Sequence, residues 1–362
     1  MGDDGQLARP LTADESAFIR NERLLSAVDY LYWAERYSTL KLDGGGLGTL
    51  KFWESQRILL AIVAKAEVEM WEAADRGEPV DGILLCCHKA RQLGLTAIMR
   101  SLTMHRMTLH HHQRALAGSV DEDKIQELYD RDKDILDNLP WWLRPTVGAD
   151  EKRQHLSFER LGTRLLYQAS AQKSGVGQGR QFELGHLTEC ASWLYPDTIE
   201  YDYFPTIPQS TNALVGLEST ANGRGNWWHD FVNRVRAGHS RRWRFVFIPW
   251  YAEVSKYRAA PPDRWRPSEV SLLHAQMVYD SSPEFLGRHV MLSPQQLYWW
   301  ESTRAEHLRA SKLNIFLSNF CATVEESFQH AQVSVFSPET LEALRLHTAP
   351  GLPYELVTKE AA

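Results

Sequence analysis

The sequence predicts an α/β fold with a mainly parallel central sheet. Three observations support this. Apolar runs of strand length alternate with helical patterns over residues 52–248, as expected where crossover helices join parallel strands. One run, residues 83–87, passes through a tight loop that carries Gly94 into a helical pattern. Two later runs end in polar side chains, at Glu189 and at Ser219, and ligands of parallel sheets bind at the carboxyl ends of strands.

The expected strands are short apolar runs bounded by turn-forming or charged residues. They are residues 83–87, 112–117, 156–158, 164–169, 182–188, 213–218 and 244–248. Because the runs 156–158 and 164–169 are so close in the sequence, we expect them to pair as a hairpin.

The expected helices have apolar residues spaced three and four apart. They are residues 52–71, 95–107, 121–136, a helix from about residue 226, and 292–311. Pro140 follows the charged helix 121–136 and closes it, since proline cannot continue a helix.

The sequence divides into three parts. Residues 1–50 are expected to form a helical extension that ends at a flexible glycine cluster, Gly44–Gly46. Residues 51–260 carry all the expected strands and form the core. Residues 261–362 have a helical pattern and are expected to be a lid or linker.

Composition excludes several classes of protein. Hydrophobic residues make up 43% of the 362 residues, which is ordinary for a globular domain. The net charge of −6 excludes a basic protein that binds nucleic acid over its whole surface, but not a local basic face. The chain lacks a run of membrane-spanning length, a signal peptide and a zinc or disulfide pattern among its four cysteines. We therefore expect neither membrane association nor secretion.

The first buried strand leads into a loop with the features of a phosphate cradle. Backbone N–H groups at a helix N-terminus, together with the helix dipole, favour a bound anion. In the common motif G-x-x-x-x-G-K-[ST], Gly94 and Thr96 match the second glycine and the hydroxyl, but Leu95 stands at the lysine position. The cation is expected at the front of the loop, as Lys89 or Arg91. An ordinary strand–loop–helix corner with two solvated cations is the alternative.

A carboxylate follows the expected strand 182–188. Phosphoryl hydrolysis requires a group that orients and polarises water, and Glu189 has a suitable position. The aspartate that usually precedes it on the magnesium side is replaced by Thr188, whose hydroxyl holds a metal-bound water more weakly. A surface residue or a helix cap is the alternative for Glu189.

Small polar residues follow the expected strand 213–218. Ser219, Thr220 and Asn222 could sense the γ-phosphate and relay its presence, whereas a capped strand-to-helix turn at Asn222 and Gly223 is the alternative. The three features occur in order within one α/β unit. This order favours a P-loop NTPase with a helical C-terminal lid.

Together these residues resemble the ATPase domain of the large terminase subunit of tailed bacteriophages, the DNA-packaging motor. Residues 89–96 look like that family's variant Walker A cradle, in which an early basic residue replaces the late lysine. Residues 186–191 are similar to its Walker B segment, and residues 218–223 to its coupling segment. The resemblance covers about residues 52–336.

The resemblance implies roles for individual residues. Gln56 would read adenine, and Glu189 would activate water. Arg91 and Arg180 would stabilise transition-state charge, Arg180 in cis or on a neighbouring subunit, although a solvated loop arginine is as good an account of Arg180. The residues implied in binding nucleotide are Gln56, Lys89, Ala90, Arg91, Gln92, Leu93, Gly94, Leu95 and Thr96. Those implied in binding Mg²⁺ are Thr96 and Thr188, and those implied in coupling are Ser219, Thr220 and Asn222.

The resemblance also implies a function. A viral ATPase would hydrolyse ATP with Mg²⁺ in the host cell cytoplasm and move double-stranded DNA into a procapsid. Its partners would be the portal, the small terminase subunit and further copies of itself in a ring. Arginine-rich residues 234–244 are a candidate DNA contact, with a solvated basic face as the alternative. Because residues 352–362 lack a metal-binding constellation, we expect the nuclease domain usual in this family to be missing, either by truncation or because it is a separate chain.

Two other functions remain open at this point. A helicase-like DNA-dependent ATPase would share the cradle but separate strands. A catalytically degenerate nucleotide-binding module would dock partner proteins, and Leu95 and Thr188 in place of lysine and aspartate favour it.

Overall fold

The computed structural model describes residues 9–41, 45–148, 155–170, 176–177 and 179–329. Its centre is a seven-stranded sheet of order β5-β6-β4-β7-β8-β3-β9. The strands are β3 (Ile83–Lys89), β4 (Arg114–Ser119), β5 (His155–Phe158), β6 (Thr163–Ala169), β7 (Leu184–Thr188), β8 (Leu214–Ser219) and β9 (Trp243–Ile248). All neighbours are parallel except β5 and β6, which form the expected hairpin. The mainly parallel α/β fold is thereby confirmed.

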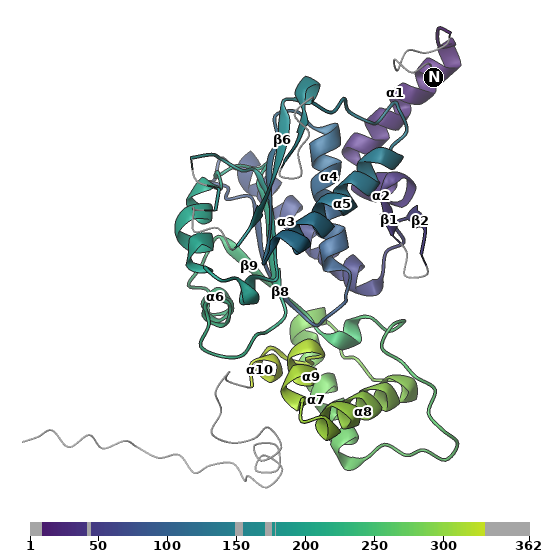
Figure 1. The fold of residues 1–362 in the computed structure, drawn as a ribbon, viewed down its shortest axis with the longest axis vertical. Coiled ribbons are helices and arrows are strands. Elements are labelled where there is room, and N and C mark those ends of the chain that lie inside the picture. Colours follow the sequence, from purple (N-terminus) through teal and green to yellow (C-terminus); the bar gives the residue numbers. More distant parts are fainter. Residues whose placement is uncertain (1–8, 42–44, 149–154, 171–175, 178, 330–362) are drawn as a thin grey trace, which may run out of the picture.

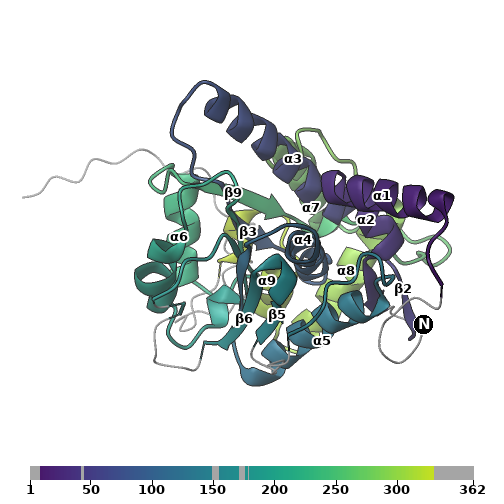
Figure 2. The same cartoon turned by 90° about the horizontal axis from the view of Figure 1, so that it is seen from above.

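Helices cover both faces of the sheet (Figure 1). On one face lie α3 (Glu54–Asp75), α4 (Leu95–Leu109) and α5 (Glu122–Asn138), and on the other lies α6 (Trp227–Arg236). Seen from above, α4 lies between α3 and α5 (Figure 2). This central place explains why nearly all residues of α4 are buried.

The N-terminal part packs on the outer side of α4 and contains α1 (Ala13–Val28) and α2 (Tyr30–Tyr37). Two short strands follow, β1 (Thr39–Lys41) and β2 (Leu47–Thr49), which pair antiparallel. The sequence predicted only a flexible connection here, because three-residue strands are too short to produce a period-two pattern. Gly44 of the expected glycine cluster lies outside the described residues.

In the described chain, four α-helices follow the last strand and lie beyond the end of the sheet (Figure 1). They are α7 (Glu269–Leu286), α8 (Pro294–Arg309), α9 (Leu313–Asn319) and α10 (Val324–Ser327). They occupy the described portion of the expected lid, whereas residues 330–362 lie outside it. No helix among the described residues has the length and apolar character needed to cross a membrane.

Single-turn helices interrupt several loops of the described chain. They are η1 (Glu159–Leu161), η2 (Cys190–Ser192), η3 (Ile199–Tyr203), η4 (Phe204–Thr206) and η5 (Trp250–Ala252). The strand expected from residue 112 begins instead at Arg114. The reason is that His112 has a left-handed φ of 57° and donates its N–H to the carbonyl of Leu161 in a turn.

A buried ionic network joins three elements of the core. Arg100 on α4 donates from Nε to Asp132 Oδ1 on α5 at 3.0 Å, with a second bond from Nη2 to Oδ2. The hydroxyl of Tyr167 on β6 donates to the same carboxylate at 2.6 Å. Because both charges are fully buried, each depends on the other for compensation.

Candidate nucleotide site

The sheet brings the predicted motifs to one edge. Strands β3, β7 and β8 are parallel, so their carboxyl ends meet, and β8 lies between the other two. Neighbouring strands are about 4.8 Å apart, which separates the ends of β3 and β7 by roughly 10 Å. Lys89, at the end of β3, and Glu189, directly after β7, therefore face the same space beyond the sheet.

The loop between β3 and α4 presents a row of free amides. The N–H groups of Ala90 and Arg91 donate to the carbonyls of Ile248 (2.9 Å) and Asn319 (2.7 Å). In the described part of the chain, the next five N–H groups, residues 92–96, donate to no protein acceptor. Left-handed φ angles at Gln92 (55°) and Gly94 (71°) bend this backbone at the N-terminus of α4, where free amides of a protein can bind an anion.

Side chains from α3 form hydrogen bonds with the backbone of this loop. Gln56 is buried; its Nε2 donates to the carbonyl of Gly94 at 3.1 Å, and its Oε1 accepts from the N–H of Trp53 at 2.9 Å. Ser55 donates to the carbonyl of Leu93 at 2.9 Å. Both ends of the Gln56 amide are thus engaged within the protein, next to the cradle, while the resemblance implied a contact to adenine.

The two candidate cations have different surroundings. The side chain of Lys89 is 14% exposed, and its Nζ lies 4.0 Å from Oε2 of Glu218. Arg91 is exposed, and its backbone carbonyl accepts a hydrogen bond from the hydroxyl of Tyr257. Lys89 is therefore the cation that lies inside the site, and Arg91 lies at its margin.

Glu218, near the end of β8, is a site residue that sequence reasoning missed. Its Oε1 accepts from the hydroxyl of Thr96 at 2.5 Å and lies 3.2 Å from Nε2 of His186. Burial raises the pKa of this carboxyl, but Lys89, His186 and Thr96 together outweigh burial and lower the pKa to about 2. A charged residue inside the apolar run 214–219 was the signal available in the sequence.

Glu189 is exposed and has a left-handed φ of 56°. This conformation costs a non-glycine residue on the order of 1–3 kcal/mol and is concentrated at functional sites. Two of the residues predicted to act in coupling hold the segment after it: Ser219 accepts from the N–H of Ala191 at 3.1 Å, and Asn222 donates to the Ala191 carbonyl at 3.3 Å. Thr220 follows Ser219 and is half-buried.

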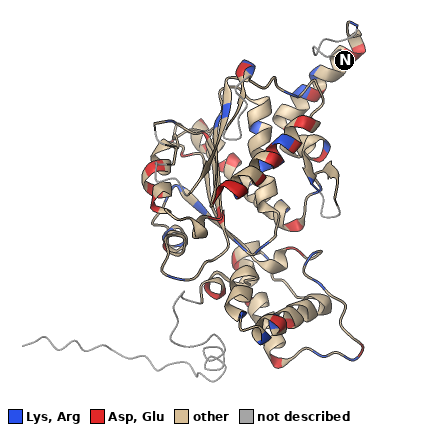
Figure 3. Cartoon of the chain, viewed as in Figure 1, with Lys and Arg blue, Asp and Glu red and all other residues tan. Residues whose placement is uncertain are grey.

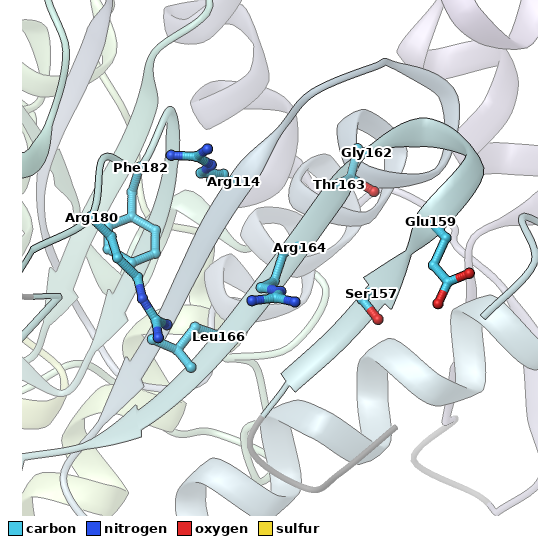
Figure 4. A pocket seen from close by; sticks show the side chains of 9 residues that line it. All are labelled: Arg114, Ser157, Glu159, Gly162, Thr163, Arg164, Leu166, Arg180 and Phe182. Carbon is cyan, nitrogen blue, oxygen red and sulfur yellow. The ribbon is translucent and has the colours of Figure 1, made fainter. Parts of the chain in front are cut away.

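Arg180 lies at the opposite edge of the sheet. It precedes β7, whereas Glu189 follows that strand, so the length of β7, roughly 16 Å, separates them. Arg114, Arg164 and Arg180 line a cavity of about 500 Å³. Their side chains are shown in Figure 4. The other lining residues are Ser157, Glu159, Gly162, Thr163, Leu166 and Phe182. This position argues against a role of Arg180 in cis and leaves a role on a neighbouring subunit and a solvated loop arginine as the alternatives.

The arginines of residues 234–244 are mostly engaged in ion pairs. The pairs are Arg234–Glu200, Arg236–Glu284, Arg236–Glu325, Arg242–Asp81 and Arg244–Glu69. Acidic and basic residues are interspersed over the ribbon in Figure 3. This stretch is therefore not a basic face of unpaired charges.

A search of solved structures found similarity to phage large terminases. The large terminase of bacteriophage HK97 superposes with a TM-score of 0.53 and 11% identity over 82% of this chain and 55% of that one. The Thermus phage P74-26 large terminase ATPase domain has a TM-score of 0.41 and 10% identity over 71% of this chain and 92% of that one. The large terminase from a thermophilic bacteriophage, in complex with ADP, has a TM-score of 0.39 and 13% identity over 62% of this chain and 50% of that one. No family model and no curated protein sequence matches the chain. The chain spans about half the length of the HK97 protein and has the α/β fold of a phage large terminase.

Proposed function

We propose that this chain is the ATPase motor portion of a viral terminase, which moves double-stranded DNA into a procapsid by hydrolysing ATP. The observation that carries the proposal is the row of five free amides at residues 92–96. It lies beside Lys89 and Thr96, on the same sheet edge as Glu189. Backbone amides at a helix N-terminus, with a nearby cation, match the charge and spacing of a polyphosphate.

Each residue of the site then has a task. The amides of residues 92–96 hold the phosphate oxygens, and Lys89 neutralises charge that develops on them. Glu189 orients the attacking water. The hydroxyl of Thr96 and Oε2 of Glu218, which has no hydrogen-bond partner among the described residues, would hold Mg²⁺, a cation that prefers oxygen ligands and would supply further charge neutralisation.

Contacts from the site to the helices α7–α10 provide a route for coupling. Arg91 donates its N–H to Asn319 on α9, and Arg224, in the loop after β8, donates to the carbonyl of Phe328. Ser219 and Asn222 hold the segment that follows Glu189. A change at the phosphates would therefore displace the helices relative to the sheet, and this displacement would move DNA.

The proposed assembly includes partners outside the chain. The motor would act as a homo-oligomeric ring on the portal of a procapsid, with the small terminase subunit, in the host cell cytoplasm. Arg180 of one copy would then stabilise charge in the site of its neighbour. The exposed cluster formed by Arg114, Arg164 and Arg180 makes no ion pair with the described residues, which leaves it available for such a contact.

The decisive experiment compares nucleotide binding with turnover. Glu189→Gln should bind ATP with unchanged affinity but lose turnover by at least ~100-fold, because the amide cannot polarise water. Glu122→Gln, an exposed glutamate at the start of α5, is the matched control and should keep full turnover. Full activity of Glu189→Gln would remove the catalytic role. Absence of Mg²⁺-dependent hydrolysis by the wild-type protein, with or without DNA, would favour a nucleotide-binding docking module, and strand displacement would favour a helicase.

A further inference from the structure

We propose that Glu218 supplies the magnesium-side carboxylate of the site from β8, in place of the aspartate that position 188 on β7 does not provide. The inference rests on the proposed function, because it concerns a metal that would bind together with nucleotide. It assigns a metal-binding role to the first residue of the segment 218–223, to which the resemblance gave no role of its own.

The strand register places this carboxylate one strand closer to the cradle. Glu218 pairs with Thr188 of β7 on one side and with Cys87 of β3 on the other. Residues paired in register point to the same face of a sheet. A carboxylate at position 218 therefore has the same orientation as one at position 188, but it lies next to β3, the strand that leads into the loop with Thr96.

The contacts of Glu218 leave one oxygen for a cation. Oε1 accepts from Thr96 and lies within hydrogen-bond distance of His186. Oε2 is buried and has no hydrogen-bond partner in the described structure; the nearest cation is Lys89 Nζ, at 4.0 Å. Buried polar atoms are rarely left without partners, and a carboxylate oxygen beside a threonine hydroxyl is the donor set that Mg²⁺ takes from proteins.

His186 is the positioning residue for this carboxylate. It lies on β7, fully buried, and its Nε2 lies 3.2 Å from Oε1 of Glu218. A hydrogen bond from Nε2 to Oε1 fixes the rotation of the carboxylate and leaves Oε2 toward Lys89. Within the described chain, Nδ1 of His186 has no partner, consistent with protonation at Nε2.

The metal would require the nucleotide as a co-ligand. Among the described residues, no group of three acidic, histidine or cysteine side chains could hold a metal ion unaided. Mg²⁺ sites in phosphoryl-transfer proteins commonly combine one or two carboxylates with phosphate oxygens and water. Metal affinity should therefore be weak in the free protein and much stronger in its complex with nucleotide.

The test measures metal binding rather than turnover. Mn²⁺, as a paramagnetic substitute, is titrated into the protein with and without ADP and followed by electron paramagnetic resonance. Glu218→Gln should weaken Mn²⁺ binding to the ADP complex by roughly 10- to 100-fold, while ADP still binds without metal. Glu218→Gln combined with Thr188→Asp returns a carboxylate to β7 and should recover part of the affinity. Unchanged Mn²⁺ affinity in Glu218→Gln would overturn the inference.

Controls separate this inference from the proposed function and from misfolding. Glu22→Gln changes another buried glutamate, far from the site, and should leave Mn²⁺ binding unchanged. If Glu218→Gln does not fold, Glu218→Asp keeps the charge but shortens its reach, and it should also weaken Mn²⁺ binding. Unchanged affinity in that variant would likewise contradict the inference. A wild-type protein that binds neither ADP nor ATP would refute the proposed function itself.

Discussion

Gly94→Ala should destabilise the protein by an amount that can be worked out from its surroundings. Gly94 has a φ of 71°, and an added Cβ would lie 2.4 Å from Nε2 of Gln56. The left-handed conformation costs an alanine about 1–2 kcal/mol. Displacing the Gln56 amide breaks its bond to the Gly94 carbonyl, which adds about 1 kcal/mol. We therefore expect the free energy of unfolding to fall by about 2–3 kcal/mol.

A double-mutant cycle measured by urea unfolding tests the contact. Gln56→Ala removes the hydrogen bonds to Gly94 and Trp53 but also makes room for the new Cβ. The two changes together should cost about 1 kcal/mol less than the sum of the single changes, because the bond to Gly94 is lost only once. Strict additivity of the two losses would refute the reasoning.

The same Gln56 variant distinguishes support of the cradle from recognition of adenine. If the amide only supports the loop, Gln56→Ala should weaken ATP and GTP binding equally. A loss confined to ATP would instead show that the side chain leaves Gly94 and contacts the base. Competition binding with both nucleotides decides between these outcomes.

Two further predictions concern stability. Asp132→Asn should lower the free energy of unfolding by about 3–5 kcal/mol, because the buried charge of Arg100 loses its compensation. The control Glu78→Gln, which removes a charge from an exposed ion pair, should leave the urea midpoint unchanged. Equal effects of the two substitutions would contradict the argument. Burial lowers the pKa of His274, which stacks on Trp300, to about 3. Below about pH 6.5 the imidazole is protonated in the unfolded chain but stays neutral in the folded protein. The free energy of unfolding therefore decreases by about 1.4 kcal/mol for each pH unit that the pH is lowered. The free energy of unfolding of His274→Phe, relative to that of wild type, should therefore rise by about 2 kcal/mol when the pH is lowered from about 7.5 to about 5. A difference between the two proteins that does not change with pH would contradict this.

The sequence was sufficient for features that depend on local order. Apolar runs located the strands of the sheet, and the loop with Gly94 located the corner between β3 and α4. The distance of Arg180 from Glu189 could also have been calculated from the sequence, because a five-residue strand separates the two residues. Its placement at the far edge follows from strand length alone.

The contacts of Glu218 could not be read from the sequence in the same way. Thr96 and Glu218 are 122 residues apart, and they meet only because β8 lies between β3 and β7. Strand order depends on how the crossover helices pack, and no local pattern encodes it. The hydrogen bonds of Gln56 to Gly94 and Trp53 were likewise not readable from the sequence, and the adenine contact came only from the resemblance.

The stacking of His88 determines where this protein can be shortened. Its ring, near the carboxyl end of β3, stacks on the rings of Phe247 and Phe328, at centroid distances of 5.6 and 4.7 Å. The carbonyl of Asn319 accepts a hydrogen bond from the N–H of Arg91, in the loop that follows the same strand. A fragment cut near residue 260 would open this aromatic stack to water and release the loop, so expression fragments should extend past Phe328.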